Sequence, residues 1–108
     1  MQVRVSREAC CAQDDQLGPL DATYDVRSGA AIGELVSAIV GSNFLQYSSS
    51  HTSMFGSVRG KPFVRVFSSY YEPSRVSEFL VPETELVATV VGSQTVEFRF
   101  ALSVSHAA

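Results

Sequence analysis

The chain has 108 residues, of which 45% are hydrophobic and 18% charged, and its formal net charge is −3 at pH 7. That length suits one domain with one core, and that apolar share argues against intrinsic disorder. A negative net charge argues against general nucleic-acid binding, which needs a basic field to neutralise phosphates. No apolar run could span a membrane and the first ten residues lack the apolar centre of a signal peptide, so we expect a cytoplasmic protein.

The N-terminal half predicts two strands and then a helix. Apolar and polar residues alternate over 1–5 and 21–26, which is typical of half-buried strands joined as a hairpin by a long loop. From residue 28 the period becomes helical, with Ser28 as the expected N-cap and Gly41 as the expected end. The apolar stripe of this helix is Ile32, Leu35, Val36, Ile39 and Val40.

The second half predicts mostly strands. Residues 53–58 and 62–67 form two strands around the turn "RGK", and residues 85–91 and 95–104 form a final hairpin around "GSQ". Between these pairs, Pro73 is expected to open a short helix. The buried face of that helix would be Val76, Phe79 and Leu80.

These elements predict an α+β fold. We expect a two-layer sandwich in which one main helix packs on a mixed, mostly antiparallel sheet of about five to six strands. Residues 1–102 would form a single domain, and residues 103–108 a frayed tail.

The order of elements resembles the β-grasp fold of ubiquitin-like proteins. "MQVRV" is similar to their first strand, and "DATYDV" with "SGAAIGELVSAIV" to their second strand and central helix. "GSVRGKPF" is similar to their mid-chain turn, and "VPETELVATVV" to the loop that enters their last strand. The resemblance covers most of the chain as an order of elements, and it implies a role in binding another protein.

Two features depart from the ubiquitin-like pattern. The first hairpin carries a long insertion around residues 10–20. The C-terminal "SVSHAA" lacks the Gly-Gly with which ubiquitin-like modifiers and sulfur carriers are activated, so conjugation and sulfur transfer are not expected.

The two cysteines, Cys10 and Cys11, are adjacent and are followed closely by Asp14 and Asp15. A structural zinc site needs about four ligands in tetrahedral geometry, and adjacent cysteines are poorly placed to share one ion. Free cysteine more often behaves as a small buried hydrophobe. We therefore expect no metal site here and no cofactor elsewhere.

A serine run beside a histidine, Ser48 to Ser50 with His51, could supply a nucleophile and its base, and Cys11 with His51 is a second pairing of this kind. Nucleophilic catalysis also needs a positioned base and an oxyanion hole, and no motif marks either. "GSVRGK" lacks the spacing of a phosphate-binding loop. We therefore do not expect an enzyme.

Two groups of residues are candidates for binding a protein. Asp14, Asp15 and Asp21 make the first hairpin loop acidic, which suits contact with a basic partner. A second group belongs to "SSYYEPSR", where tyrosine and arginine are residue types enriched at binding hot spots. The members of this group are Tyr70, Tyr71 and Arg75, although tyrosines serve equally often in packing.

The leading interpretation is a small cytoplasmic protein-binding module. A concrete version is a stoichiometric inhibitor, such as a bacterial immunity protein that occludes the active site of a toxin. The alternatives are a small-ligand-binding or regulatory domain with a pocket between helix and sheet, or a ubiquitin-like protein without the Gly-Gly. The expected partner is a protein, and neither nucleic acid nor a membrane.

Overall fold

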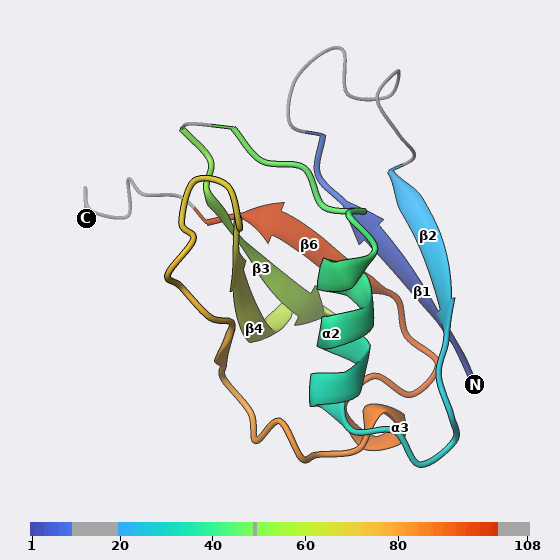
Figure 1. Cartoon of the computed structure of the whole chain (residues 1–108). Coiled ribbons are helices and arrows are strands. Elements are labelled where there is room, and N and C mark those ends of the chain that lie inside the picture. Colours follow the sequence, from blue (N-terminus) through green and yellow to red (C-terminus); the bar gives the residue numbers. More distant parts are fainter. Residues whose placement is uncertain (10–19, 49, 102–108) are drawn as a thin grey trace.

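The computed structural model describes residues 1–9, 20–48 and 50–101 (Figure 1). Within these residues the chain forms six strands and two helices. In chain order they are β1 (Gln2–Arg7), β2 (Asp21–Asp25), α2 (Ile32–Gly41), β3 (Ser53–Val58), β4 (Lys61–Phe67), β5 (Glu78–Phe79), α3 (Val87–Val90) and β6 (Val96–Phe100).

The six strands form one sheet in the order β2-β1-β6-β3-β4-β5. Strands β1 and β6 pair in parallel, and every other neighbouring pair is antiparallel. The prediction of an α+β fold with a mixed, mostly antiparallel sheet is confirmed. The two predicted hairpins, β1–β2 and β3–β4, are also present.

A single hydrophobic cluster joins the helices to the sheet. Figure 1 shows α2 in front of the sheet, and its residues Ile32, Leu35 and Ile39 are buried in the same cluster as Val3 and Val5 of β1. The remaining strands add their alternate residues to this cluster, as period-2 burial requires. From β3, β4 and β6 these include Met54, Val64, Val66, Val96, Phe98 and Phe100. Val40, predicted on the buried stripe of α2, is instead 41% exposed.

The N-terminus of α2 differs from the prediction, because its N-cap is Ala31 and not Ser28. The first free N–H groups of a helix need acceptors. Here the carbonyls of Glu83 and Glu85 accept from Gly33 and Ile32 at 2.9 and 2.7 Å. The Glu34 carboxylate accepts from the Ala31 N–H at 3.0 Å. Backbone carbonyls of a segment distant in the sequence therefore cap the helix, in place of the serine that was predicted to do so.

Residues 85–91 were predicted as a strand of a final hairpin, and this is wrong, because α3 occupies Val87–Val90. Val87 and Val91 are both buried, which places an i, i+4 pair on one helical face. The Val87 N–H donates to the Ala30 carbonyl at 3.0 Å, and Leu86 forms an isolated bridge with Ala31. These backbone contacts join the segment to the start of α2 and not to a strand of the sheet.

The short helix predicted to start at Pro73 is also absent from the described chain. Residues 78–79 form β5, which pairs with β4 through Val64 and Arg65. Val76 is 79% exposed and Leu80 53% exposed, so two of the three residues expected to form a buried face are not buried. The backbone of residues 78–79 forms hydrogen bonds with the free edge of β4. A single helical turn after Pro73 would satisfy fewer of these backbone groups.

The β3–β4 hairpin turns on Arg59 and Gly60, with φ of 55° and 77°. Two successive positive φ values in a two-residue loop define a type I′ turn, in which Asn-Gly is the preferred pair. Gly60 adopts this conformation freely, whereas a left-handed residue with a Cβ costs roughly 1–2 kcal/mol. Arg59 is therefore a strained choice for its position.

Gly56 of β3 tests the packing of the core. A Cβ at this position would lie 2.8 Å from Cε1 of Phe98 and 2.9 Å from Cγ1 of Val64. We predict that Gly56→Ala lowers the free energy of unfolding by about 1–3 kcal/mol, the usual cost of overpacking. Urea denaturation followed by circular dichroism measures this change.

Gly41 provides the matched control, because the same substitution there meets nothing within 4 Å. It is the last residue of α2, so Gly41→Ala should raise stability by up to about 1 kcal/mol through helix propensity. Equal destabilisation by both variants would contradict the packing described around Gly56.

Glu34 gives the fold a defined response to acid. Its carboxylate receives the Arg27 guanidinium at 3.0 and 2.7 Å, and this ion pair, followed by the hydrogen bond from Ala31, holds the pKa of Glu34 below its ordinary value of 4.5. A lowered pKa in the folded state stabilises the protein above the unfolded pKa. That contribution should disappear as the pH falls below about 4.5 towards the folded pKa.

We predict that Glu34→Gln lowers the melting temperature at pH 7 and reduces the further loss seen between pH 5 and pH 3. Thermal denaturation across this range tests both effects. Glu85→Gln is the control, since Glu85 is exposed and forms no ion pair within the described residues. An unchanged melting temperature for Glu34→Gln at pH 7 would mean that the ion pair and cap contribute nothing.

Candidate functional site

The segment that follows β4 is a hydrogen-bonded turn built around Ser68. Ser68 is only 3% exposed, and its Oγ accepts the N–H groups of Tyr70 and Tyr71 at 3.1 and 3.0 Å. Its carbonyl accepts the Glu72 N–H at 2.9 Å. A serine hydroxyl that caps successive N–H groups stabilises a local turn. The two tyrosines are therefore presented on fixed backbone.

Glu72 and Arg75 attach this turn to the sheet. The Thr52 hydroxyl donates to the Glu72 carboxylate at 3.2 Å, and the Arg75 guanidinium lies 3.9 Å from Glu72 and 3.4 Å from Glu78. The same guanidinium lies 4.0 Å from the centre of the Phe67 ring, a cation–π contact. Arg75, predicted as a binding residue, is thus already engaged in holding the segment.

The two tyrosine rings are the most exposed aromatic side chains described. Tyr70 is 81% exposed and Tyr71 42% exposed, and their rings meet edge to face with centroids 4.8 Å apart. They border a cavity of about 310 Å³ that Val40 of α2 also lines. We call Tyr70, Tyr71, Val40 and this cavity the tyrosine surface.

The cavity of the tyrosine surface is polar but uncharged. Asn43, Gln46 and Tyr47 from the segment after α2 line it, together with Ser68. Burial raises the pKa of the Tyr47 hydroxyl well above its ordinary value. Tyr47 therefore stays neutral and can donate a hydrogen bond at any physiological pH.

The other predicted binding residues lie elsewhere. Asp21 opens β2, an exposed edge strand, and β1, β6 and β3 separate that strand from β4. At about 4.8 Å between strands, Asp21 lies roughly 19 Å from the strand that leads to Tyr70. Asp14 and Asp15 fall outside the described residues. The fold does not gather Asp21 and the tyrosines into one site.

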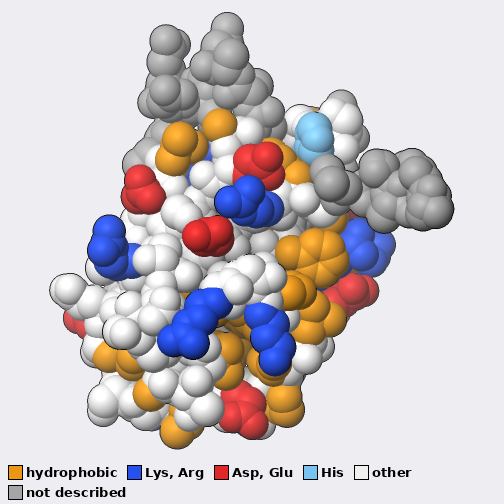
Figure 2. All heavy atoms as spheres, turned by 180° about the vertical axis from the view of Figure 1, so that it is seen from behind, with side chains coloured by type: hydrophobic (Ala, Val, Ile, Leu, Met, Phe, Trp, Pro, Cys, Tyr) orange, Lys and Arg blue, Asp and Glu red, His pale blue; other side chains and the backbone are white. Residues whose placement is uncertain are grey.

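The outer face of the sheet carries charges of both signs. Figure 2 shows basic and acidic side chains interspersed over the side of the molecule opposite α2. In the cross-strand register, Arg65 and Arg99 lie on either side of Phe55, and Arg99 pairs with Glu97 at 3.5 Å. Arg65 stacks on Phe55 and Phe67 with its Cζ 5.5 and 5.0 Å from the ring centres. This mixed surface offers no extended basic track for phosphates.

The serine and histidine candidates form a small turn. Ser48 and His51 exchange backbone hydrogen bonds at 3.0 and 3.1 Å, and the Ser48 Oγ lies 3.4 Å from Nδ1 of His51. The imidazole packs on the Phe100 ring with centroids 4.5 Å apart. These contacts are those of a local turn packed on the core, and Ser49 is outside the described residues. Cys11, the other suggested partner of His51, is also outside them.

The metal candidates Cys10 and Cys11 likewise lie outside the described chain, with Asp14 and Asp15. In residues 1–9, 20–48 and 50–101, no group of three or more His, Cys, Asp or Glu side chains is placed to hold a metal ion. In the same residues, neither helix has the length and apolar content needed to cross a membrane.

Comparison with known proteins finds no matching family model, no matching curated protein and no matching solved structure. The interpretation of the site therefore rests on its geometry.

Sequence reasoning found the two tyrosines but missed the residues opposite them. Val40 was assigned to the buried stripe of α2, and Tyr47 was not singled out. One local signal was present, since Gly41, Ser42 and Asn43 mark the helix end that exposes this corner. The pairing of that corner with the turn after β4 depends on tertiary packing.

Ser68 is the residue on which the presentation of the tyrosines depends. We predict that Ser68→Ala lowers the free energy of unfolding by about 1–3 kcal/mol, because it removes an acceptor and leaves part-buried N–H groups without a partner. Chemical denaturation measures the loss, and hydrogen exchange at Tyr70 and Tyr71 should accelerate. Ser69→Ala is the control, since Ser69 is exposed. Equal effects of the two variants would contradict the role of Ser68.

Proposed function

We propose that this protein is a protein-binding module whose partner docks on the tyrosine surface. The observation that carries the proposal is the 81% exposure of Tyr70 on a backbone fixed by Ser68. An aromatic ring left in water forgoes the stabilisation that its burial would bring. A partner that covers Tyr70 would recover this free energy on binding.

The rigidity of the turn supports the same proposal. Binding costs free energy whenever loops and side chains must be ordered, and a surface that is already ordered avoids much of that cost. The hydrogen bonds of Ser68 and Glu72 order the backbone beneath both tyrosines. Tyrosine also loses little conformational entropy on binding, which is one reason for its frequency at binding hot spots.

The chemistry of the cavity indicates what the partner brings. None of the described residues that line it is charged, and Asn43, Gln46 and Tyr47 supply hydrogen-bonding groups beside the apolar Val40. A partner would therefore insert an apolar or aromatic side chain with a hydrogen-bonding tip. An ion pair at this point is not needed, because the neighbouring Arg75 is already paired with Glu72 and Glu78.

The sheet order supports placing this module with the β-grasp folds of ubiquitin-like proteins. A parallel central pair, β1 and β6, is flanked by the β1–β2 hairpin on one side and by β3 and β4 on the other, and α2 connects β2 to β3. The succession of β1, β2, α2, β3 and β4 along the chain agrees with the resemblance noted in the sequence. The relationship remains part of the proposal.

A narrower version makes the protein a stoichiometric inhibitor, such as an immunity protein. Small size and a net charge of −3 support it, as does Asp21 at the start of the edge strand β2. In this version the negative charge on the edge strand β2 would attract a basic partner, which would then bind to the tyrosine surface.

The test is affinity capture from the source cell with the wild-type chain and with the double variant Tyr70→Ala, Tyr71→Ala as baits. We predict that the wild type recovers a stoichiometric protein partner and that the double variant binds it at least tenfold more weakly. Both rings are exposed, so the variant should keep the melting temperature of the wild type within a few degrees. Titration calorimetry with the purified partner gives the affinities.

Val76→Ala is the matched control, because Val76 is 79% exposed but does not line the cavity. It should bind the partner as the wild type does. Capture of no stoichiometric partner, or equal capture by the double variant, would overturn the proposal.

A further inference from the structure

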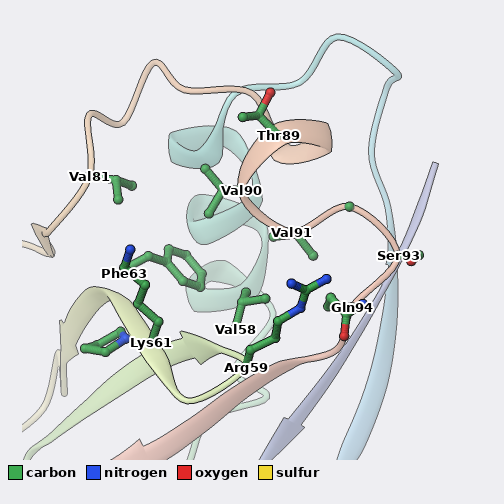
Figure 3. Close-up of a pocket in the computed structure, with 12 residues that line it drawn as sticks. Val58, Arg59, Lys61, Phe63, Val81, Thr89, Val90, Val91, Ser93 and Gln94 are labelled. Carbon is green, nitrogen blue, oxygen red and sulfur yellow. The ribbon is translucent and has the colours of Figure 1, made fainter.

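A second cavity, of about 650 Å³, lies between the β3–β4 turn and α3 (Figure 3). It shares no lining residue with the tyrosine surface. Its volume falls in the range of sites that hold small molecules. We call it the α3 cavity.

The floor of the α3 cavity is apolar. Val58 and Phe63 come from the β3–β4 hairpin, and Val90 and Val91 from the end of α3, while Val81 closes one side. Figure 3 shows the Phe63 ring below Val90, with the Val58 side chain beside them. Val81 and Val90 are only partly buried, so they keep apolar surface that a ligand could cover.

The mouth of the α3 cavity is cationic. Arg59 and Lys61 line it, both are exposed, and neither is joined by an ion pair to any part of the chain that the structure describes. Figure 3 shows Arg59 reaching from the turn towards Val91 and Gln94. No aspartate or glutamate is among the described residues that line it.

The backbone at Arg59 provides an independent observation. Its φ of 55° places an arginine where a type I′ turn favours glycine or asparagine. Non-glycine residues in such conformations are uncommon, and they cluster at functional sites. The strain would be relieved by glycine, which would also remove the guanidinium from the cavity mouth.

We propose that the α3 cavity binds a small amphipathic anion, with its apolar body on the valine and phenylalanine floor and its carboxylate or similar group at Arg59. Lys61, which extends on the Phe63 and Val81 side in Figure 3, adds positive charge to the mouth. Arginine offers a planar pair of donors that suits a carboxylate, and lysine adds a mobile charge. A purely polar anion would leave the floor exposed, and a neutral ligand would leave both cations unpaired.

The test is titration of the full-length protein with octanoate, followed by NMR of the backbone amides. We expect saturable shifts at Val58, Val90 and Val91. Octylammonium has the same chain with the opposite charge, and it should bind at least tenfold more weakly. The double variant Arg59→Gly, Lys61→Gln should also bind octanoate at least tenfold more weakly, while its melting temperature equals or exceeds that of the wild type.

Arg4→Gln is the matched control, since Arg4 is an exposed cation of β1 that does not line the α3 cavity. It should bind octanoate as the wild type does. Absence of saturable shifts, equal binding of octanoate and octylammonium, or equal binding by the Arg59 and Lys61 double variant would overturn the proposal. None of these outcomes bears on the tyrosine surface, so the two proposals fail or stand separately.

Discussion

The parallel pairing of β1 with β6 is the interaction on which the rest of the structure depends. It joins Val5 to Val96 and Arg7 to Phe98, whereas the two hairpins need only neighbouring parts of the chain. Glu8 extends this joint, because its N–H donates to the Phe98 carbonyl at 2.9 Å and its carboxylate accepts the Phe100 N–H at 3.0 Å. Closing so long a loop costs conformational entropy. The free energy gained by burying the valines and phenylalanines must exceed that cost. Without this pair, β1–β2 and β3–β4 would be separate hairpins, neither of which is stable alone.

The sequence predicted the elements whose signal is local. Alternation over 1–5 and 21–26 and the helical spacing from Ile32 to Ile39 were sufficient, because each places apolar residues on one face. Residues 85–91 misled because β-branched residues favour strands, yet Val87 and Val91 also fit helical spacing. In the fold, the Val87 N–H donates to the Ala30 carbonyl, which joins the start of this helix to the segment before α2. Such a contact between residues far apart in the chain has no signature in a local window.

The two candidate sites also differ in how much of each could be predicted from local sequence. Tyr70 and Tyr71 stood out because their residue types are informative without knowledge of the fold. Val40 and Tyr47 became part of the tyrosine surface only when the end of α2 met the turn after β4. The α3 cavity was hidden for a stronger reason, since one of its walls is the helix that the sequence had predicted as a strand. When the secondary structure of a segment is predicted wrongly, a site that the segment lines cannot be predicted either.

Two non-glycine residues of the described chain have positive φ, Asn43 at 60° and Arg59 at 55°, and each lines one of the two cavities. Their causes differ. Asn43 lies just after α2, where left-handed asparagine is a common way to end a helix, so the fold alone accounts for it. Arg59 has no such account, because glycine or asparagine would make the same turn with less strain. Residues that break a local rule are expected at functional or strained sites. The Arg59 side chain lies at the mouth of the α3 cavity, which supports the anion site proposed there.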